Sequence, residues 1–186
     1  MDESRVEFEL GDEVPLATTP SLTLVLAVFK FDRMEWAIEK CTELGVAKIV
    51  PVIARRTDAH LAAASAKRAD RWRRIALQAA EQSRRTTPPE IASPMKLFDA
   101  LNLTSDMRIV LAESEQQPLL RDVFESPATG ANKETALAVG PEGGWTAEEL
   151  QQFHEAGWIA ASLGPTILRA ETAAIAATAI LISELC

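Results

Sequence analysis

The stretch that most constrains the fold runs from Thr135 to Trp145 and reads TALAVGPEGGW. An apolar strand leads into three glycines and a proline, which cannot continue as ordinary strand or helix. Thr146, followed three residues later by Glu149, predicts a capping box and a helix that ends near Gly157. A strand, a glycine loop and a helix start together offer free backbone N–H groups that suit a nucleotide-like ligand. The pattern is neither GxGxxG nor a Walker loop, so a ligand loop and a structural turn both stay open.

A second stretch repeats this design. Residues 162–173 read SLGPTILRAETA, which predicts the end of an apolar strand, a Gly-Pro loop and the start of a helix. Two such loops at the carboxyl ends of two strands form one crevice if the strands are neighbours, and α/β sheets bind their ligands in such crevices. We therefore expect the two loops to share a site.

The rest of the chain alternates between predicted strands and helices, which indicates an α/β fold with a mostly parallel sheet flanked by helices. Pro51 lacks an N–H donor and predicts that its strand lies at an edge or carries a bulge. Asp32 with Glu35 resembles the cap of the first helix, and residues 60–69 read as irregular or weakly helical. The expected strands are 22–28, 48–53, 108–112, 135–139 and 159–163, and the expected helices are 32–44, 70–82, 95–101, 118–124, 146–156 and 170–185.

Composition narrows the class of protein. The 186 residues are 47% hydrophobic and 25% charged, as in a globular domain, and no apolar run approaches the length of a membrane span. The acidic start, Met1-Asp2-Glu3, is not followed by an apolar signal segment. Cys41 and Cys186 are too few for a disulfide framework or a zinc site, which favours the cytoplasm and no metal.

Charge is distributed unevenly. The chain carries −8, but residues 55–85 hold nine basic and three acidic side chains, a local charge of +6. Such asymmetry is typical of a phosphate-binding face, although a solvated helix surface would have the same composition. The candidate RNA-binding residues are Arg55, Arg56, Arg71, Arg74, Arg84 and Arg85.

The last predicted helix, 170–185, is apolar nearly all round. A helix of this kind must be buried, either in the core of its own subunit or against a second copy in a homodimer.

Four motifs, in this order, resemble the small-subunit ribosomal RNA methyltransferase E family: EKCTELGV at 39–46, QAAEQSRR at 78–85, GPEGGW at 140–145 and SLGPTILRAETA at 162–173. The resemblance implies a SPOUT methyltransferase domain with a deep trefoil knot, packed as a homodimer. It further implies that S-adenosylmethionine supplies a methyl group to N3 of a uridine in 16S rRNA. Family members begin with a PUA-like domain, so residues 1–20 are expected to be its remnant and linker, and residues 21–186 the methyltransferase domain.

Carried over to this chain, the resemblance implies that three loops bind the cofactor, at 111–115, 139–144 and 162–168. The expected cofactor-binding residues are Leu111, Ala112, Glu113, Val139, Gly140, Pro141, Gly143, Gly144, Ser162, Leu163, Gly164, Ile167, Leu168 and Thr172. Arg169 is the candidate catalytic residue, which either stabilises a developing uracil anion or holds a phosphate, with a salt bridge at a helix start as the alternative. Glu142 and Glu171 are ambiguous between a base and a structural role, and Trp145 is expected to serve packing.

Alternatives stay open at this point. One alternative is that the chain is a SPOUT methyltransferase that acts on a different RNA. Another is that it is a protein of the same fold that binds RNA or assists ribosome assembly without catalysis. A different nucleotide-binding α/β enzyme is a third reading, which the missing GxGxxG and Walker patterns disfavour.

Overall fold

The computed structural model describes residues 7–9, 11, 20–112, 118–123 and 133–185. The elements are β1 (Leu22–Ala27), α1 (Phe31–Leu44), β2 (Lys48–Ile53), α2 (Ala59–Gln82), β3 (Glu90–Ile91), β4 (Met95–Lys96), α3 (Leu97–Ala100), β5 (Met107–Leu111), a 3-10 helix η1 (Leu120–Val123), β6 (Thr135–Val139), α4 (Ala147–Glu155), β7 (Ile159–Ala161) and α5 (Ala170–Leu185).

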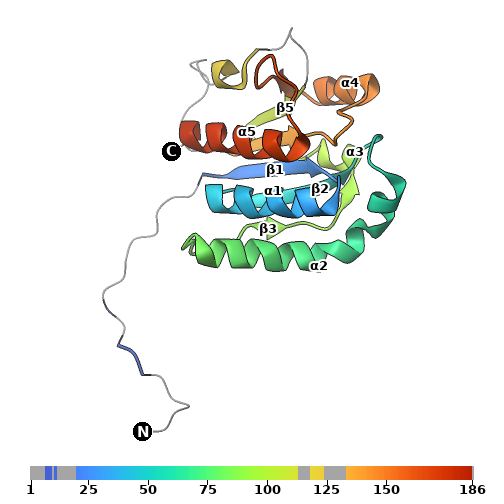
Figure 1. The fold of residues 1–186 in the computed structure, drawn as a ribbon. Coiled ribbons are helices and arrows are strands. Elements are labelled where there is room, and N and C mark those ends of the chain that lie inside the picture. The colour runs from blue at the N-terminus through green and yellow to red at the C-terminus, as the bar shows by residue number, and fades with distance from the viewer. Residues whose placement is uncertain (1–6, 10, 12–19, 113–117, 124–132, 186) are drawn as a thin grey trace.

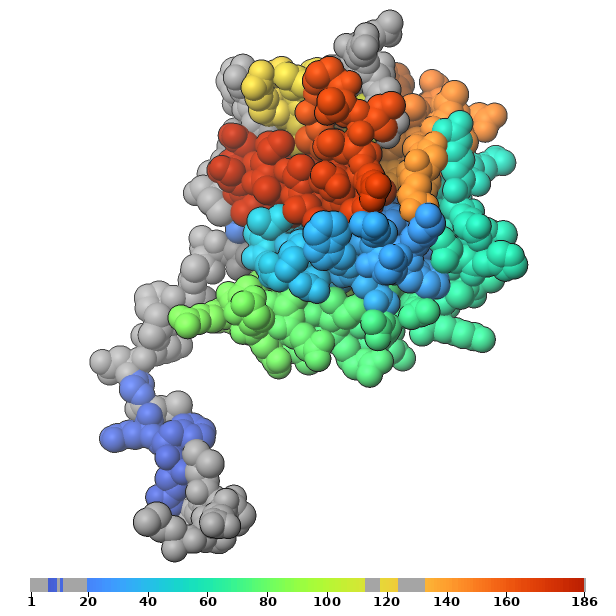
Figure 2. Space-filling view, viewed as in Figure 1, coloured from blue at the N-terminus to red at the C-terminus, as the bar shows by residue number. Residues whose placement is uncertain are grey.

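The strands form one sheet in the order β3-β2-β1-β6-β5-β7, with β4 also paired to β2. Every strand pairing among the described residues is parallel. Helices α5, α1 and α2 lie side by side along one face of the sheet (Figure 1), and in the space-filling view their side chains form a continuous layer (Figure 2). The predicted α/β class is therefore confirmed.

Side chains of β1 alternate between two cores. Leu22, Leu24 and Leu26 belong to the cluster that includes α1, α2 and α5, whereas Val25 and Ala27 belong to the cluster that includes α3 and α4. Both faces of the strand are thus covered, which explains why LTLVLA has no polar side.

Pro51 does not lie on an edge strand, because β2 is flanked by β1 on one side and by β3 and β4 on the other. The carbonyls of Ala47 and Ile49 accept hydrogen bonds from Glu90 and Ala92 on the β3 side. Backbone groups two residues apart point the same way, so the missing N–H of Pro51 faces that side too. There it meets the gap between β3, which pairs with Lys48 and Ile49, and β4, whose pairing with β2 starts at Val52. The proline is tolerated because no donor is needed at this point.

Two helix starts differ from expectation. Residues 59–69 are not irregular but form the first half of α2, a helix of 24 residues. Alanine is the strongest helix former, and the Asp58 side chain caps the helix by accepting from the N–H of His60 at 2.8 Å. Helix α1 begins at Phe31 with Lys30 at the N-cap, so Asp32 lies in the first turn and compensates the helix dipole instead of capping it.

Other boundaries shift by a few residues. The helix expected over 95–101 is divided into β4 and the four-residue α3, and the short helix expected from residue 118 is η1. Helix α4 has the predicted capping box on Thr146 and Glu149, and α5 spans the predicted 170–185.

Helix α5 is covered on one side only. Ala174, Ala177 and Leu181 are buried in the core shared with α1 and the sheet, while Thr172 and Ala179 are exposed. Among the described helices, none combines the length and the apolar character needed to span a bilayer.

Two expectations stay predictions. The segment 1–20, expected to be a domain remnant, is described only at residues 7–9, 11 and 20. The trefoil knot expected from the resemblance also stays a prediction.

Cys41 of α1 is buried in the core and accepts a hydrogen bond from the Thr178 hydroxyl at 3.5 Å. Burial raises the pKa of the Cys41 thiol to about 12.

A group whose pKa is raised by folding contributes stability at pH values below its pKa in the unfolded state. This contribution is lost as the pH rises through the pKa of the group in the folded state. Above about pH 8.5, the free energy of unfolding should therefore fall by up to about 1.4 kcal/mol per pH unit because of Cys41. Urea titrations of the wild type and Cys41→Ala check this: the variant should lose less stability per pH unit, and equal slopes would contradict it.

Candidate active site

Three neighbouring strands, β6, β5 and β7, end at the same edge of the sheet, because all are parallel. The chain that follows each strand contributes to one cavity of about 460 Å³. The cavity has the size of a small-molecule site. Its walls come from the ends of β5 and β6, the GPEGGW loop, the loop 162–168 and the first turn of α5: Leu111, Ala112, Val139, Gly140, Pro141, Glu142, Gly143, Gly144, Trp145, Ser162, Leu163, Gly164, Pro165, Thr166, Ile167, Leu168, Ala170 and Ala173, with Arg56 and Leu150 beside them.

Backbone geometry leaves the loop 162–168 open to a ligand. Gly164 has φ +124°, and a Cβ placed on it would meet no atom within 4 Å. The N–H groups of Leu163, Ile167 and Leu168 donate no hydrogen bond to any other described residue. Because buried or ligand-facing N–H groups need partners, this loop can supply donors to a bound molecule.

Gly140 packs closely on Trp145, since a Cβ on Gly140 would lie 3.2 Å from the indole Nε1. Trp145 is buried and makes an edge contact with Phe153, with ring centroids 4.9 Å apart. The expectation that Trp145 serves packing is confirmed, and the same side chain also lines the cavity.

Arg56 holds the GPEGGW loop in place. Its guanidinium donates to the carbonyl of Gly143 and, at 3.4 Å, to that of Trp145, and its stem is 3.3 Å from the Cβ position of Gly143. Arg56 was expected on an RNA-binding face. That placement needs correction, because its charged group is engaged at the cavity wall.

Glu149 ties the loop to the end of β2. This carboxylate is buried, and it accepts from the N–H of Arg55 at 2.7 Å and from that of Thr146 at 2.8 Å. The capping box was predicted from the sequence, but its link to Arg55, 94 residues away, was not. One side chain thus fixes the start of α4 and the β2–α2 connection together.

Glu149→Gln should lower the free energy of unfolding by roughly 1–3 kcal/mol, because an amide offers one acceptor oxygen where the carboxylate offers two. Urea denaturation checks the value. Glu148→Gln is the matched control, since Glu148 is exposed on the same helix turn and should change stability little. Equal stabilities of wild type and Glu149→Gln would contradict the bridging role.

Most of the predicted cofactor residues do line the cavity: Leu111, Ala112, Val139, Gly140, Pro141, Gly143, Gly144, Ser162, Leu163, Gly164, Ile167 and Leu168. Thr172 does not. It is exposed on α5, turned about 200° from Ala170, and the helix instead presents Ala170 and Ala173, three residues apart, to the cavity. Glu113 lies outside the described residues. The 3.6-residue period of α5 could have indicated Ala170 and Ala173 in place of Thr172.

The six candidate RNA-binding arginines differ in their contacts. Arg71 is bound by both oxygens of Glu35, at 2.7 and 2.8 Å, and Arg85 donates to the carbonyls of Thr42 and Val46 at the end of α1. These contacts correct the expectation that both guanidinium groups are free to meet phosphates. Arg55, Arg74 and Arg84 are exposed and separate, and their side chains bond to no other described residue.

Arg169 is exposed immediately before α5, and its side chain forms no ion pair with a described residue. The alternative of a salt bridge at the helix start is therefore not observed. Glu171, which is 2% exposed, pairs with Arg33 at 3.3 Å, and Glu142 lies 3.9 Å from Lys30. His60 and His154 are exposed, and the described part of the chain holds no group of three or more metal-ligating side chains.

Comparison with known proteins identifies the family. A family model described as an RNA methyltransferase domain matches residues 17–182. Ribosomal RNA small subunit methyltransferase E of Aquifex aeolicus is 31% identical over 188 residues, which cover 98% of this chain and 77% of that protein. The chain belongs to the ribosomal RNA small subunit methyltransferase E family. Its counterpart from Rickettsia conorii is 34% identical over 87% of this chain and 64% of its own length.

Solved structures of the family agree with the fold. The methyltransferase E of Neisseria gonorrhoeae, bound to S-adenosyl methionine, has a TM-score of 0.77 and 34% identity over 88% of this chain and 66% of that one. A putative methyltransferase of Legionella pneumophila, in complex with the cofactor SAM, has a TM-score of 0.80 and 33% identity, again covering 66% of that chain. A SpoU methyltransferase of Streptomyces viridochromogenes, at 12% identity and a TM-score of 0.55, shares the fold alone. The chain thus spans about two thirds of the length of several relatives it matches.

Proposed function

We propose that this chain is the methyl-transferring domain of an S-adenosylmethionine-dependent enzyme that methylates N3 of a uridine in the 16S rRNA of the small ribosomal subunit. The observation that carries the proposal is the convergence of three strand ends on one cavity of about 460 Å³. The two glycine loops of the family's motifs line this cavity. Relatives that share this fold at 33% and 34% identity have the same cofactor bound.

The cavity suits the cofactor chemically. Adenine needs apolar walls and backbone hydrogen-bonding groups, and the cavity offers Leu111, Leu163 and Leu168 beside the unpaired N–H groups of the loop 162–168. Gly164 adds open space in which a side chain would otherwise stand. The sulfonium of the bound cofactor supplies the methyl group as an electrophile.

The chain's own task is to position the base and to favour loss of its N3 proton. Arg169 lies between Leu168 and Ala170, which line the cavity, and has no carboxylate partner among the described residues, so its charge is available to a uracil anion or to a phosphate of the RNA. Glu171 is unsuited as a base, because it is buried and paired with Arg33.

The functional unit proposed here is a cytoplasmic homodimer that acts on RNA. The outer side of α5 supports the dimer, because its exposed and half-exposed residues include the apolar Ile175, Ala176, Ala179 and Ile180 beside the polar Thr172, Ser183 and Glu184. Sedimentation of the purified chain tests the dimer, and a monomer at micromolar concentration would contradict it.

Methyl transfer tests the function directly. Small ribosomal subunits from a strain that lacks the family's enzyme are incubated with the chain and with radiolabelled S-adenosylmethionine, and the modified nucleoside is identified by mass spectrometry. The proposal expects N3-methyluridine in 16S rRNA. Methylation of another RNA would favour the related reading of a different substrate, and cofactor binding without any transfer would favour a role in ribosome assembly.

A further inference from the structure

A second cavity, of about 610 Å³, adjoins the first across the GPEGGW loop and the loop 162–168. The two cavities share four lining residues, Glu142, Ile167, Leu168 and Ala170, so they are contiguous. Helices α1 and α5 lie side by side with their N-terminal ends at this point (Figure 1), and the second cavity is lined by Lys30 and Arg33 from one helix start and by Arg169 and Glu171 from the other.

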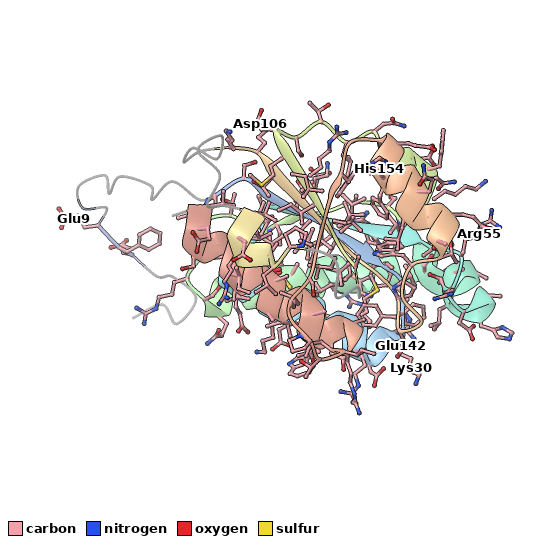
Figure 3. All side chains as sticks on the ribbon, turned by 90° about the horizontal axis from the view of Figure 1, so that it is seen from above. Glu9, Lys30, Arg55, Asp106, Glu142 and His154 are labelled. Carbon is pink, nitrogen blue, oxygen red and sulfur yellow. The ribbon has the colours of Figure 1, made fainter. Side chains whose placement is uncertain are left out.

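The charges of this cavity are not all neutralised. Glu171 forms an ion pair with Arg33 at 3.3 Å. The second carboxylate on the lining belongs to Glu142 and lies 3.9 Å from Lys30. Figure 3 shows Lys30 and Glu142 next to each other at this end of the molecule. Lys30 is 70% exposed, and Arg169 pairs with no described residue, so the lining holds three cations and two carboxylates, while Asp32, outside the lining, lies 3.8 Å from Arg33. The N-terminal ends of two helices add further positive potential.

An apolar group separates this basic cavity from the first one. Ile167 lines both cavities and is 80% exposed, so its apolar side chain is open to contact by a ligand. Its position suits contact with the flat face of a base that approaches the first cavity.

We propose that the second cavity holds a phosphate of the target RNA strand, with Lys30 and Arg169 as its ligands and Ile167 as an apolar contact for the target base. The inference rests on the proposed function, because it assigns the acceptor side of the same site. The sequence-based expectation assigned RNA binding to arginines of residues 55–85 and left a phosphate as one role of Arg169; the second cavity adds Lys30 and Ile167 to that residue. Arg33 stays structural, since Glu171 holds it.

Oligouridylate binding by the full chain tests this assignment, with fluorescence anisotropy at several salt concentrations. Lys30→Ala and Arg169→Ala should each weaken binding by about 5- to 10-fold, and the double variant should reduce the slope of log affinity against log salt by about 0.7, the value for one phosphate contact on a single strand. Arg121→Ala is the matched control, because Arg121 is exposed but lines neither cavity, and it should change neither quantity.

Glu142→Gln should act in the opposite direction. It removes the carboxylate that competes with phosphate for Lys30, so oligouridylate should bind about 2- to 5-fold more tightly. If Lys30 and Glu142 had a purely structural role, Lys30→Ala and Glu142→Gln would not change the affinity for oligouridylate in opposite directions.

The inference is overturned if wild-type binding is absent or independent of salt, or if Lys30→Ala and Arg169→Ala bind like the control. Calorimetry with S-adenosylmethionine on the same samples separates this failure from that of the proposed function. Wild type and Lys30→Ala should bind the cofactor equally, because Lys30 does not line the first cavity. A folded wild type that binds no cofactor would contradict the proposed function itself.

Discussion

Replacing Gly164 with alanine is expected to lower the affinity for S-adenosylmethionine by roughly 10- to 100-fold. Gly164 has φ +124°, which a residue with a Cβ adopts only at a cost of about 1–3 kcal/mol, and relief of this strain would move the loop that lines the first cavity. The Cβ would also enter the open space at Gly164. Isothermal titration calorimetry measures the change.

Gly157→Ala is the matched control for this variant. Gly157 also has a positive φ, +78°, but it follows α4 and lines neither cavity. Its Cβ would meet only the far end of the Arg108 side chain, at 3.3 Å. We expect both variants to lose similar stability and only Gly164→Ala to lose cofactor affinity. Equal affinities in the two variants would remove the loop 162–168 from the site.

Arg56→Ala should lower cofactor affinity by about 10-fold. Its guanidinium holds two carbonyls of the GPEGGW loop, at Gly143 and Trp145, and a hydrogen bond from a charged group contributes about 1.5–3 kcal/mol. Without it, part of the binding energy would be spent on ordering the loop. Calorimetry gives the affinity, and thermal unfolding gives the accompanying loss of stability.

Arg55→Ala is a neighbour control with the same change in charge. Only the backbone N–H of Arg55 is engaged, by Glu149, and its side chain is exposed. Its cofactor affinity should equal that of the wild type. If the two alanine variants behave alike, the effect of Arg56 is one of net charge, and the loop contact has no part in binding.

Local patterns predicted much of the fold. The capping box of α4, the apolar strands and the extent of α5 follow from short-range chemistry that one stretch of chain carries by itself. Glycine loops likewise predicted which segments line the first cavity, and twelve of the fourteen predicted cofactor residues do so. Thr172 does not line this cavity, because the helical period turns it away from Ala170 and Ala173. The motif was matched residue by residue, without regard to this period.

Contacts between distant segments could not be predicted in this way. Arg56, Arg71 and Arg85 look alike in sequence, yet one holds a loop, one is paired with Glu35, and one binds the end of α1. Their partners lie between 36 and 89 residues away, and only the assembled fold brings them together. The second cavity was missed for the same reason, because Lys30 and Arg169 meet only where the starts of α1 and α5 converge.

Titration of the purified full chain with S-adenosylmethionine by calorimetry tests the central claim most directly. We expect saturable binding of about one cofactor per subunit, at the cavity where β5, β6 and β7 end. A folded chain that shows no heat of binding at millimolar cofactor would contradict the claim that these loops form a cofactor site.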